Sequence, residues 1–260
     1  MSWAARRRFI ILLIVGAIVV AFLATVLIST FYKTPSCTDG VQNQSETGID
    51  CGGSCLYLCV AEVQLPTILF TKALTNSAGR TDVVALIENK NATAAAKNVP
   101  YTITLYGSEQ EILRVIDGTI DLPPNTRVPV YLAGAVSGQE VTSAFLEIVA
   151  SAPQWFTLVT DPRIVPTVVS VARSGSTQAP RVETVITNPS TTELANVRLV
   201  VLIEDAEKGV IAASETIVPA LPAQGKASAV FTWNSAFVGV PASIAVMPVI
   251  PLPAGRQVLP

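Results

Sequence analysis

The residues best placed for chemistry are four cysteines in one short segment: Cys37, Cys51, Cys55 and Cys59. Clustered cysteines either form disulfides or bind a metal through their thiolates. Zinc sites favour C-x-x-C pairs, whereas 13, 3 and 3 residues separate these cysteines. We therefore predict two disulfides in an oxidising compartment, with a structural zinc site as the alternative. Four cysteines allow three pairings, and spacing alone does not choose among them.

Four oxygen-bearing side chains of the same segment could bind calcium. Asp39, Asn43, Glu46 and Asp50 offer hard oxygen ligands beside glycines that allow tight turns. Their spacing does not match an EF-hand loop, so the match is one of composition. The alternative is that these side chains cap turns and face water. We expect no resident cofactor, and Ca²⁺ at these four residues is the one candidate.

Other features argue against catalysis. The chain contains no histidine, which removes Ser-His and Cys-His nucleophiles and imidazole ligands. Residues 134–138 (GAVSG) miss the G-x-S-x-G pattern by one position, and no nucleotide-binding glycine loop is present. Carboxylates on strands are usually solvated, so we predict that the chain is not an enzyme. The acids considered for a glycosidase-type pair are Asp117, Asp121, Glu140, Glu147, Glu204 and Asp205.

The composition points to a membrane and away from nucleic acid. Half of the residues are hydrophobic and only 14% are charged, with 17 basic against 19 acidic side chains. Such a balance lacks the basic surface that nucleic acids require. The low charge instead favours β-strands and a membrane-spanning segment.

An uncharged run of 24 residues over 9–32 is long enough to cross a hydrocarbon core of about 30 Å. Three arginines precede the run, so the positive-inside rule predicts a cytoplasmic N-terminus and an extracytoplasmic remainder. A cleaved signal peptide is the alternative, but its apolar region is usually shorter. We predict a basic tail over 1–8 and a single-pass helix over 9–32 in the cell membrane, with the lipid bilayer as partner.

The segment over 33–60 resembles a small cysteine-rich module of secreted and cell-surface proteins. The resemblance rests on the run C-x-D-G-x-x-N-x-x-E-x-G-x-D-C-G-G-x-C, which begins at Cys37. It implies an exported, surface-displayed protein and no reaction. So short a segment has too little apolar material for a core, and we predict a disulfide-rich knob over 33–60.

The rest of the chain contains an internal repeat with an offset of about 99 residues. Residues 70–89 align without a gap on 169–188, and later stretches align in the same order. Six or seven short strands per copy are typical of an immunoglobulin-like sandwich. We therefore predict a mainly β fold with two tandem sandwiches, over 61–152 and 153–260, the second ending in a proline-rich tail.

Period-two patterns predict which strand faces are buried. Val83, Ala85 and Ile87 share one face over 82–88, and residues 99–106 alternate in the same way. Trp155 and Phe156 lie at a proline-rich junction between the copies. We expect this aromatic pair to pack between the two domains across a short, stiff connection.

The repeats resemble small exported β-sandwich domains of the FxLYD or LEA-14 (water-stress) type. In those domains a strand ends in an asparagine-rich turn, as at 87–91, and a later strand carries a Leu-Tyr pair, as at 105–106. A Leu-Pro turn precedes the last strands, as at 122–124. The second copy keeps Asn188-Pro189 and Leu221-Pro222. The resemblance implies non-catalytic modules.

Two functions fit these expectations. In the first, a membrane-anchored surface protein displays its sandwiches outside the cell to bind or adhere to an unknown protein or glycan partner. Its contacts would lie on loops at Gly209, 237–239 or the tail 251–260. In the alternative, the chain is an accessory subunit of a cell-envelope membrane complex and docks through its helix. That helix carries a stripe of small residues at Gly16, Ala17, Ala21 and Ala24.

Overall fold

The computed structural model of the chain describes residues 3–31, 36–43, 45–76, 78–149 and 154–253. The chain divides into two compact units, Met1–Cys55 and Leu56–Pro260. Unit 1 contains helix α1 (Trp3–Phe31), and its stretch Arg6–Ser29 is long and apolar enough to cross a membrane. This agrees with the predicted single span. Tyr32, the last residue predicted for that span, lies outside the described residues.

Unit 2 begins with a short 3-10 helix, η1 (Val60–Glu62), and continues as β-strands. The first sandwich contains β1 (Thr67–Thr75), β2 (Arg80–Asn89), β3 (Ala94–Tyr106), β4 (Ile112–Leu122), β5 (Thr126–Ser137), β6 (Ser143–Ile148) and β7 (Trp155–Thr157). The second contains β8 (Thr167–Gly175), β9 (Pro180–Thr187), β10 (Leu194–Glu204), β11 (Val210–Leu221), β12 (Lys226–Thr232) and β13 (Ser243–Val249).

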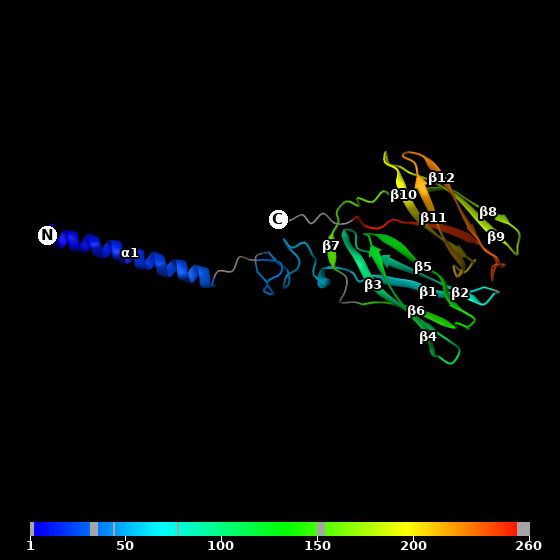
Figure 1. Cartoon of the computed structure of the whole chain (residues 1–260), viewed down its shortest axis with the longest axis horizontal. Coiled ribbons are helices and arrows are strands. Elements are labelled where there is room, and N and C mark those ends of the chain that lie inside the picture. The colour runs from blue at the N-terminus through cyan, green and yellow to red at the C-terminus, as the bar shows by residue number, and fades with distance from the viewer. Residues whose placement is uncertain (1–2, 32–35, 44, 77, 150–153, 254–260) are drawn as a thin grey trace. The chain divides into compact units, whose positions relative to one another are not determined.

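The strands form four antiparallel sheets with the same internal order in both halves (Figure 1). Sheet I is β4-β3-β6, with β7 added beside β3, and sheet II is β1-β2-β5. Sheet III is β11-β10-β13, and sheet IV is β12-β9-β8. Adding seven to each strand number converts sheet I into sheet III and sheet II into sheet IV. A tandem duplication predicts this relation.

The first core lies between sheets I and II. Val83, Ala85 and Ile87 point into it with no exposed surface, as their alternation predicts. Trp155 belongs to the same core at 1% exposed, because β7 pairs with the start of β3. Our expectation that Trp155 packs between the two domains is therefore wrong. The indole fills the first sandwich instead.

A separate apolar cluster joins sheet II to sheet III. Val84 of β2 packs there with Val200 and Leu202 of β10, and these three side chains are at most 1% exposed. Since Val83 and Val201 on the opposite faces are also fully buried, β2 and β10 are covered on both sides. The four sheets therefore stack as layers I, II, III and IV, with a core at each of three junctions.

The two copies differ at the positions that form the third core. The position equivalent to Val84 on outer sheet IV is Glu183, which pairs with Arg181 at 2.8 Å. The alignment slips by one residue at β3 and β10, where Asn98 matches Asn196, so the positions equivalent to Val200 and Leu202 on outer sheet I are Thr102 and Thr104. At these positions each copy thus carries apolar residues on the sheet that meets the other copy and polar residues on its outer sheet.

A buried asparagine holds one end of the first sandwich together. Asn89, fully buried at the end of β2, directs its side-chain amide Nδ2 at three carbonyl oxygens. These belong to Ala94 at 2.9 Å, Leu122 at 3.1 Å and Pro123 at 2.8 Å. The amide therefore joins sheet II to both β3 and β4 of sheet I.

The second sandwich repeats this arrangement with Asn188, which is 1% exposed. Its Nδ2 lies 2.7, 3.2 and 3.1 Å from the carbonyl oxygens of Thr192, Leu221 and Pro222. We call the end of unit 2 that contains both asparagines the near end. The far end contains the β1–β2 and β10–β11 turns.

Replacing Val84 by Glu, the residue found at the equivalent outer position, should separate sheets II and III. An unpaired carboxylate buried there costs roughly 3–5 kcal/mol, which urea unfolding of the full chain in lipid nanodiscs would measure. Val169→Glu, at a residue that is 54% exposed, is the matched control and should cost less than about 0.5 kcal/mol. Equal stability of the two variants would contradict the packing described.

Replacing Asn89 by Ala should leave three buried carbonyl groups without their shared donor. We expect a loss of roughly 2–4 kcal/mol in the free energy of unfolding. Asn234→Ala, at an exposed loop asparagine, is the control and should stay within about 0.5 kcal/mol of the unmodified chain. A cost for Asn89→Ala no larger than that of the control would refute the structural role of this amide.

Candidate functional site

The cysteine segment over 37–59 is closed by disulfides, as predicted. Cys37 is bonded to Cys55, with their Cα atoms 5.7 Å apart, and this settles one pairing that the spacing left open. Cys51 and Cys59 are disulfide-bonded as well, so the described residues contain no free cysteine. Oxidised sulfurs are not thiolate ligands, and the zinc alternative therefore does not fit.

Asp39 and Asp50, two of the predicted calcium ligands, cap turns of their own loop. The Asp50 carboxylate accepts the backbone N–H groups of Asp39 at 2.9 Å and Gly40 at 3.0 Å. Asp39 accepts the N–H of Val41 at 3.0 Å and the side-chain amide of Asn43 at 2.9 Å. These bonds are those of the turn-capping alternative.

Glu46 is the most buried member of the predicted calcium set, at 8% exposed. Its carboxylate accepts the Asn43 N–H at 3.1 Å, and Oε1 lies 3.2 Å from Cys55 Sγ, which has no proton to donate in a disulfide. One hydrogen-bonded pair is thus Asp39 with Asp50, and the other is Asn43 with Glu46. The Asn43 side-chain amide links the two pairs by donating to Asp39. Their bonds give them a structural part in the loop, and calcium binding there stays a prediction.

In unit 2, the far end of the seam between sheets II and III opens into a broad cleft of about 1110 Å³. It is lined by the end of β1, the starts of β2 and β11, Tyr131 of β5, the stretch 140–141, Gln178 and the loop over 232–238. The loop predicted for partner contacts at 237–239 contributes Phe237 and Val238. Gly209 lies in the adjoining β10–β11 turn, and residues 254–260 of the predicted tail lie outside the described residues.

A fixed polar pair lies on one wall of the cleft. The Tyr131 hydroxyl donates to Asp82 at 2.8 Å, and the Gly134 N–H donates to the same carboxylate at 2.6 Å. Burial, followed by the hydrogen bond to Asp82, raises the pKa of Tyr131 well above its usual value. The Tyr131 phenol thus serves as a donor to Asp82, whose carboxylate also pairs with Arg80 at 3.2 Å.

The opposite wall carries the aromatic part of the cleft. Trp233 and Phe237 meet edge to face with ring centroids 5.1 Å apart, and Trp233 Nε1 donates to the Ala213 carbonyl at 3.2 Å. Val238 beside them is 86% exposed. Within the described part of the chain, Lys72 and Glu140 on the rim form no ion pair. The cleft thus combines rigid rings with unpaired charges.

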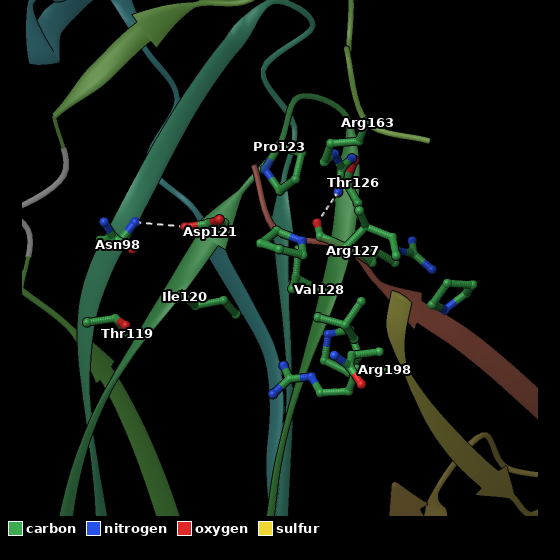
Figure 2. A pocket seen from close by; sticks show the side chains of 16 residues that line it. Asn98, Thr119, Ile120, Asp121, Pro123, Thr126, Arg127, Val128, Arg163 and Arg198 are labelled. Atoms are coloured by element: carbon green, nitrogen blue, oxygen red, sulfur yellow. Dashed lines mark hydrogen bonds between the residues drawn. The ribbon is translucent and has the colours of Figure 1, made fainter. Parts of the chain in front are cut away.

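A smaller pocket of about 380 Å³ opens at the near end of the same seam (Figure 2). It holds three arginines, each paired with an acid: Arg127 with Glu88 at 2.8 Å, Arg163 with Asp161 at 2.7 Å and Arg198 with Glu215 at 3.6 Å. Because each of these arginines already has a carboxylate partner, we assign the pocket a structural role between sheets II and III.

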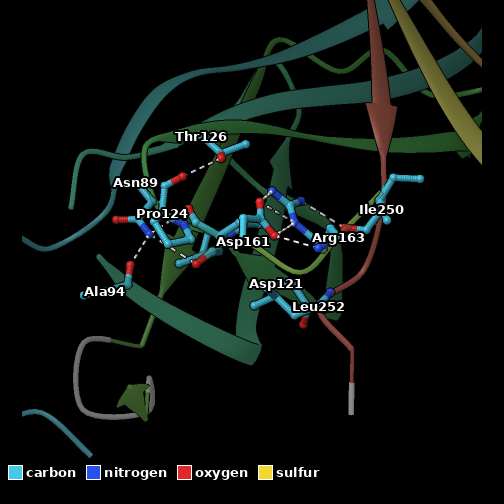
Figure 3. Close-up of polar contacts among 11 residues, drawn as sticks. Asn89, Ala94, Asp121, Pro124, Thr126, Asp161, Arg163, Ile250 and Leu252 are labelled. Atoms are coloured by element: carbon cyan, nitrogen blue, oxygen red, sulfur yellow. Dashed lines mark hydrogen bonds and ion pairs between the residues drawn. The ribbon is translucent and has the colours of Figure 1, made fainter. Parts of the chain in front are cut away.

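Arg163 and Asp121 latch the chain at this end (Figure 3). The Arg163 side chain, 7% exposed, grips Asp161 and also donates to the Ile250 carbonyl at 3.1 Å. Asp121 accepts the N–H groups of Asn98 at 2.8 Å and Leu252 at 2.7 Å. Arg163 and the segment 250–252 are therefore both held by hydrogen bonds, and residues 150–153 of the predicted stiff junction lie outside the described residues.

The acids considered for catalysis are spread over unit 2, although Asp117 and Glu147 flank Thr102 on the two strands beside it in sheet I, and Glu204 and Asp205 are consecutive. Asp121 belongs to the near-end latch, and Glu140 lies at the far-end cleft. Asp117 accepts the Thr102 hydroxyl, Glu204 accepts the Ser243 hydroxyl and Asp205 accepts the Gly209 N–H. Sequence reasoning did not single out Asp82, Tyr131 or Trp233. Asp82 and Tyr131 meet through the pairing of β2 with β5 within sheet II, and the packing of the two sandwiches brings Trp233 to the same cleft.

No family model matches this chain, and neither does any curated protein. Among solved structures, the chain is similar to a red sea bream transglutaminase at 15% identity and a TM-score of 0.23, covering 72% of this chain and 31% of that one. It is also similar to a glycoside hydrolase family 2 β-glucuronidase at 12% identity and a TM-score of 0.21, covering 78% and 25%. The chain thus spans a third or less of either protein. At these TM-scores neither likeness bears on function.

Removing the guanidinium in Arg163→Ala should cost about 1–3 kcal/mol at pH 7, through the lost charged hydrogen bonds. Arg163, chiefly through its hydrogen bond, lowers the pKa of Asp161 below the ordinary 3.8. A pKa that is lower in the folded state stabilises the fold above the ordinary value, and this contribution disappears as pH falls through the lowered pKa. The stability gap to the unmodified chain should therefore narrow below about pH 4. A gap that is independent of pH in urea unfolding, or one equal to that of the exposed control Arg127→Ala, would contradict the latch.

Proposed function

We propose that this chain is a non-catalytic, single-pass membrane protein that binds an extracytoplasmic partner through its far-end cleft. The observation that carries the proposal is the position of that cleft within unit 2. The first strands' lead-in and the last described segment of unit 2 both lie at the near end, where the Leu58 N–H donates to the Trp155 carbonyl and the Leu252 N–H donates to Asp121. The cleft lies at the other end of unit 2.

Two observations support an extracytoplasmic location. Arg6, Arg7 and Arg8 precede the apolar stretch of α1, which favours a cytoplasmic N-terminus. Disulfides persist in oxidising compartments, and the cysteines directly after α1 are oxidised.

The chemistry of the cleft favours binding over catalysis. Asp82 is occupied by the Tyr131 hydroxyl and the Gly134 N–H, so it is not poised as a base. The cleft is open rather than enclosed, unlike the sites that surround most of a small ligand. Exposed apolar side chains beside aromatic rings are instead typical of contacts with a surface-presented protein or glycan.

A photo-crosslinking amino acid at Val238 tests this proposal on intact cells. We expect a defined crosslinked partner from Val238 and none from the control position Val169, which is exposed on β8. Equal yields at both positions would refute a specific cleft. Crosslinks to integral membrane proteins from a probe at Gly16, with none from Val238, would favour the accessory-subunit alternative.

A further inference from the structure

We propose that the outer edge of β1 accepts an extended polypeptide strand of the partner, so that sheet II gains a strand inside the far-end cleft. This inference rests on the proposed function and names the class of partner for the same cleft. Strand addition draws its affinity from main-chain hydrogen bonds and its specificity from alternate side chains.

The register of β1 shows which backbone groups are available. Asn76 donates its N–H to the Arg80 carbonyl, so this pair is hydrogen-bonded. Bonded and non-bonded pairs alternate in an antiparallel ladder, so Thr75 and Ala73, opposite Thr81 and Val83, are non-bonded. Their N–H and C=O groups, with those of Thr71, therefore point away from β2. β1 pairs with no strand other than β2 among the described residues.

The layers around β1 would hold an added strand on both faces. Sheet II lies between sheets I and III, so a strand beside β1 would have one face toward Glu140 and Val141, which precede β6 of sheet I. Its other face would meet the start of β11 and the loop that carries Trp233 and Phe237. Residues 72–76 of β1 themselves line the cleft.

The neighbouring edge of β11 is already covered. Trp233 Nε1 donates to the Ala213 carbonyl, and Gly239 lies against the Ile211 side chain. Edge strands are commonly protected by charged residues, and Lys72 on β1 is such a residue. Since its ammonium forms no ion pair within the described part of the chain, it also offers a site for an acidic side chain. We therefore infer an extended partner segment with apolar residues on one face and a carboxylate opposite Lys72.

Ala73→Pro is the decisive variant, because it removes an outward N–H without removing a bond to β2. The matched control is Val171→Pro on β8, where the register opposite Thr184 also leaves the N–H pointing outward. The probe is a library of random linear peptides, displayed on phage and selected against the full chain in lipid nanodiscs. We expect selected peptides to lose at least about tenfold in affinity with Ala73→Pro and to keep it with Val171→Pro.

N-methylation of the selected peptides gives a readout that does not depend on any variant of the chain. Strand addition predicts that methylation of alternate residues abolishes binding while methylation of the residues between them does not. Equal sensitivity at all positions, or none, would overturn the proposal even if Ala73→Pro failed to fold.

Phe237→Ala separates this inference from the proposed function. Peptides that lose binding with Phe237→Ala but keep it with Ala73→Pro would show a working cleft without strand addition. Peptides indifferent to both variants would count against strand addition and the cleft alike. A library that yields no peptide whose binding depends on the cleft, as judged by Phe237→Ala, would overturn strand addition.

Discussion

Burial of β2 and β10 on both faces is the constraint on which the rest of unit 2 depends. A sandwich strand ordinarily buries one face and solvates the other, but Val84, Val200 and Leu202 form a third core between the sandwiches. This core fixes sheet II against sheet III. The far-end cleft, the near-end pocket and the latch at Arg163 all lie along the seam that it creates.

The two copies have diverged at the residues that decide which sheet is covered. The buried asparagines, Asn89 and Asn188, keep the same bonds in both copies, because each closes its own sandwich. The outer faces have changed instead, with Glu183 where the first copy has Val84. One duplicated domain thereby provides both halves of an asymmetric interface.

Much of the fold could be predicted because its signals are local. Alternation predicted the buried face of Val83, Ala85 and Ile87, and composition predicted α1. The third core was missed, although the apolar runs 83–87 and 199–203 carry the signal of a strand buried on both faces. Disulfide pairing and the meeting of Asp82 with Tyr131, 49 positions apart, depend on tertiary contacts that spacing does not encode. The cleft could not be predicted because its walls come from both copies.

The most direct test of the central claim is hydrogen exchange of the full chain in nanodiscs across increasing urea. It would compare core amides of β3, in outer sheet I, with those of β9, in outer sheet IV. If the third core couples the sandwiches into one cooperative body, both sets should exchange through the same global opening and merge onto one unfolding curve. Two separate opening free energies, each with its own dependence on urea, would show that the sandwiches unfold independently and would contradict the account.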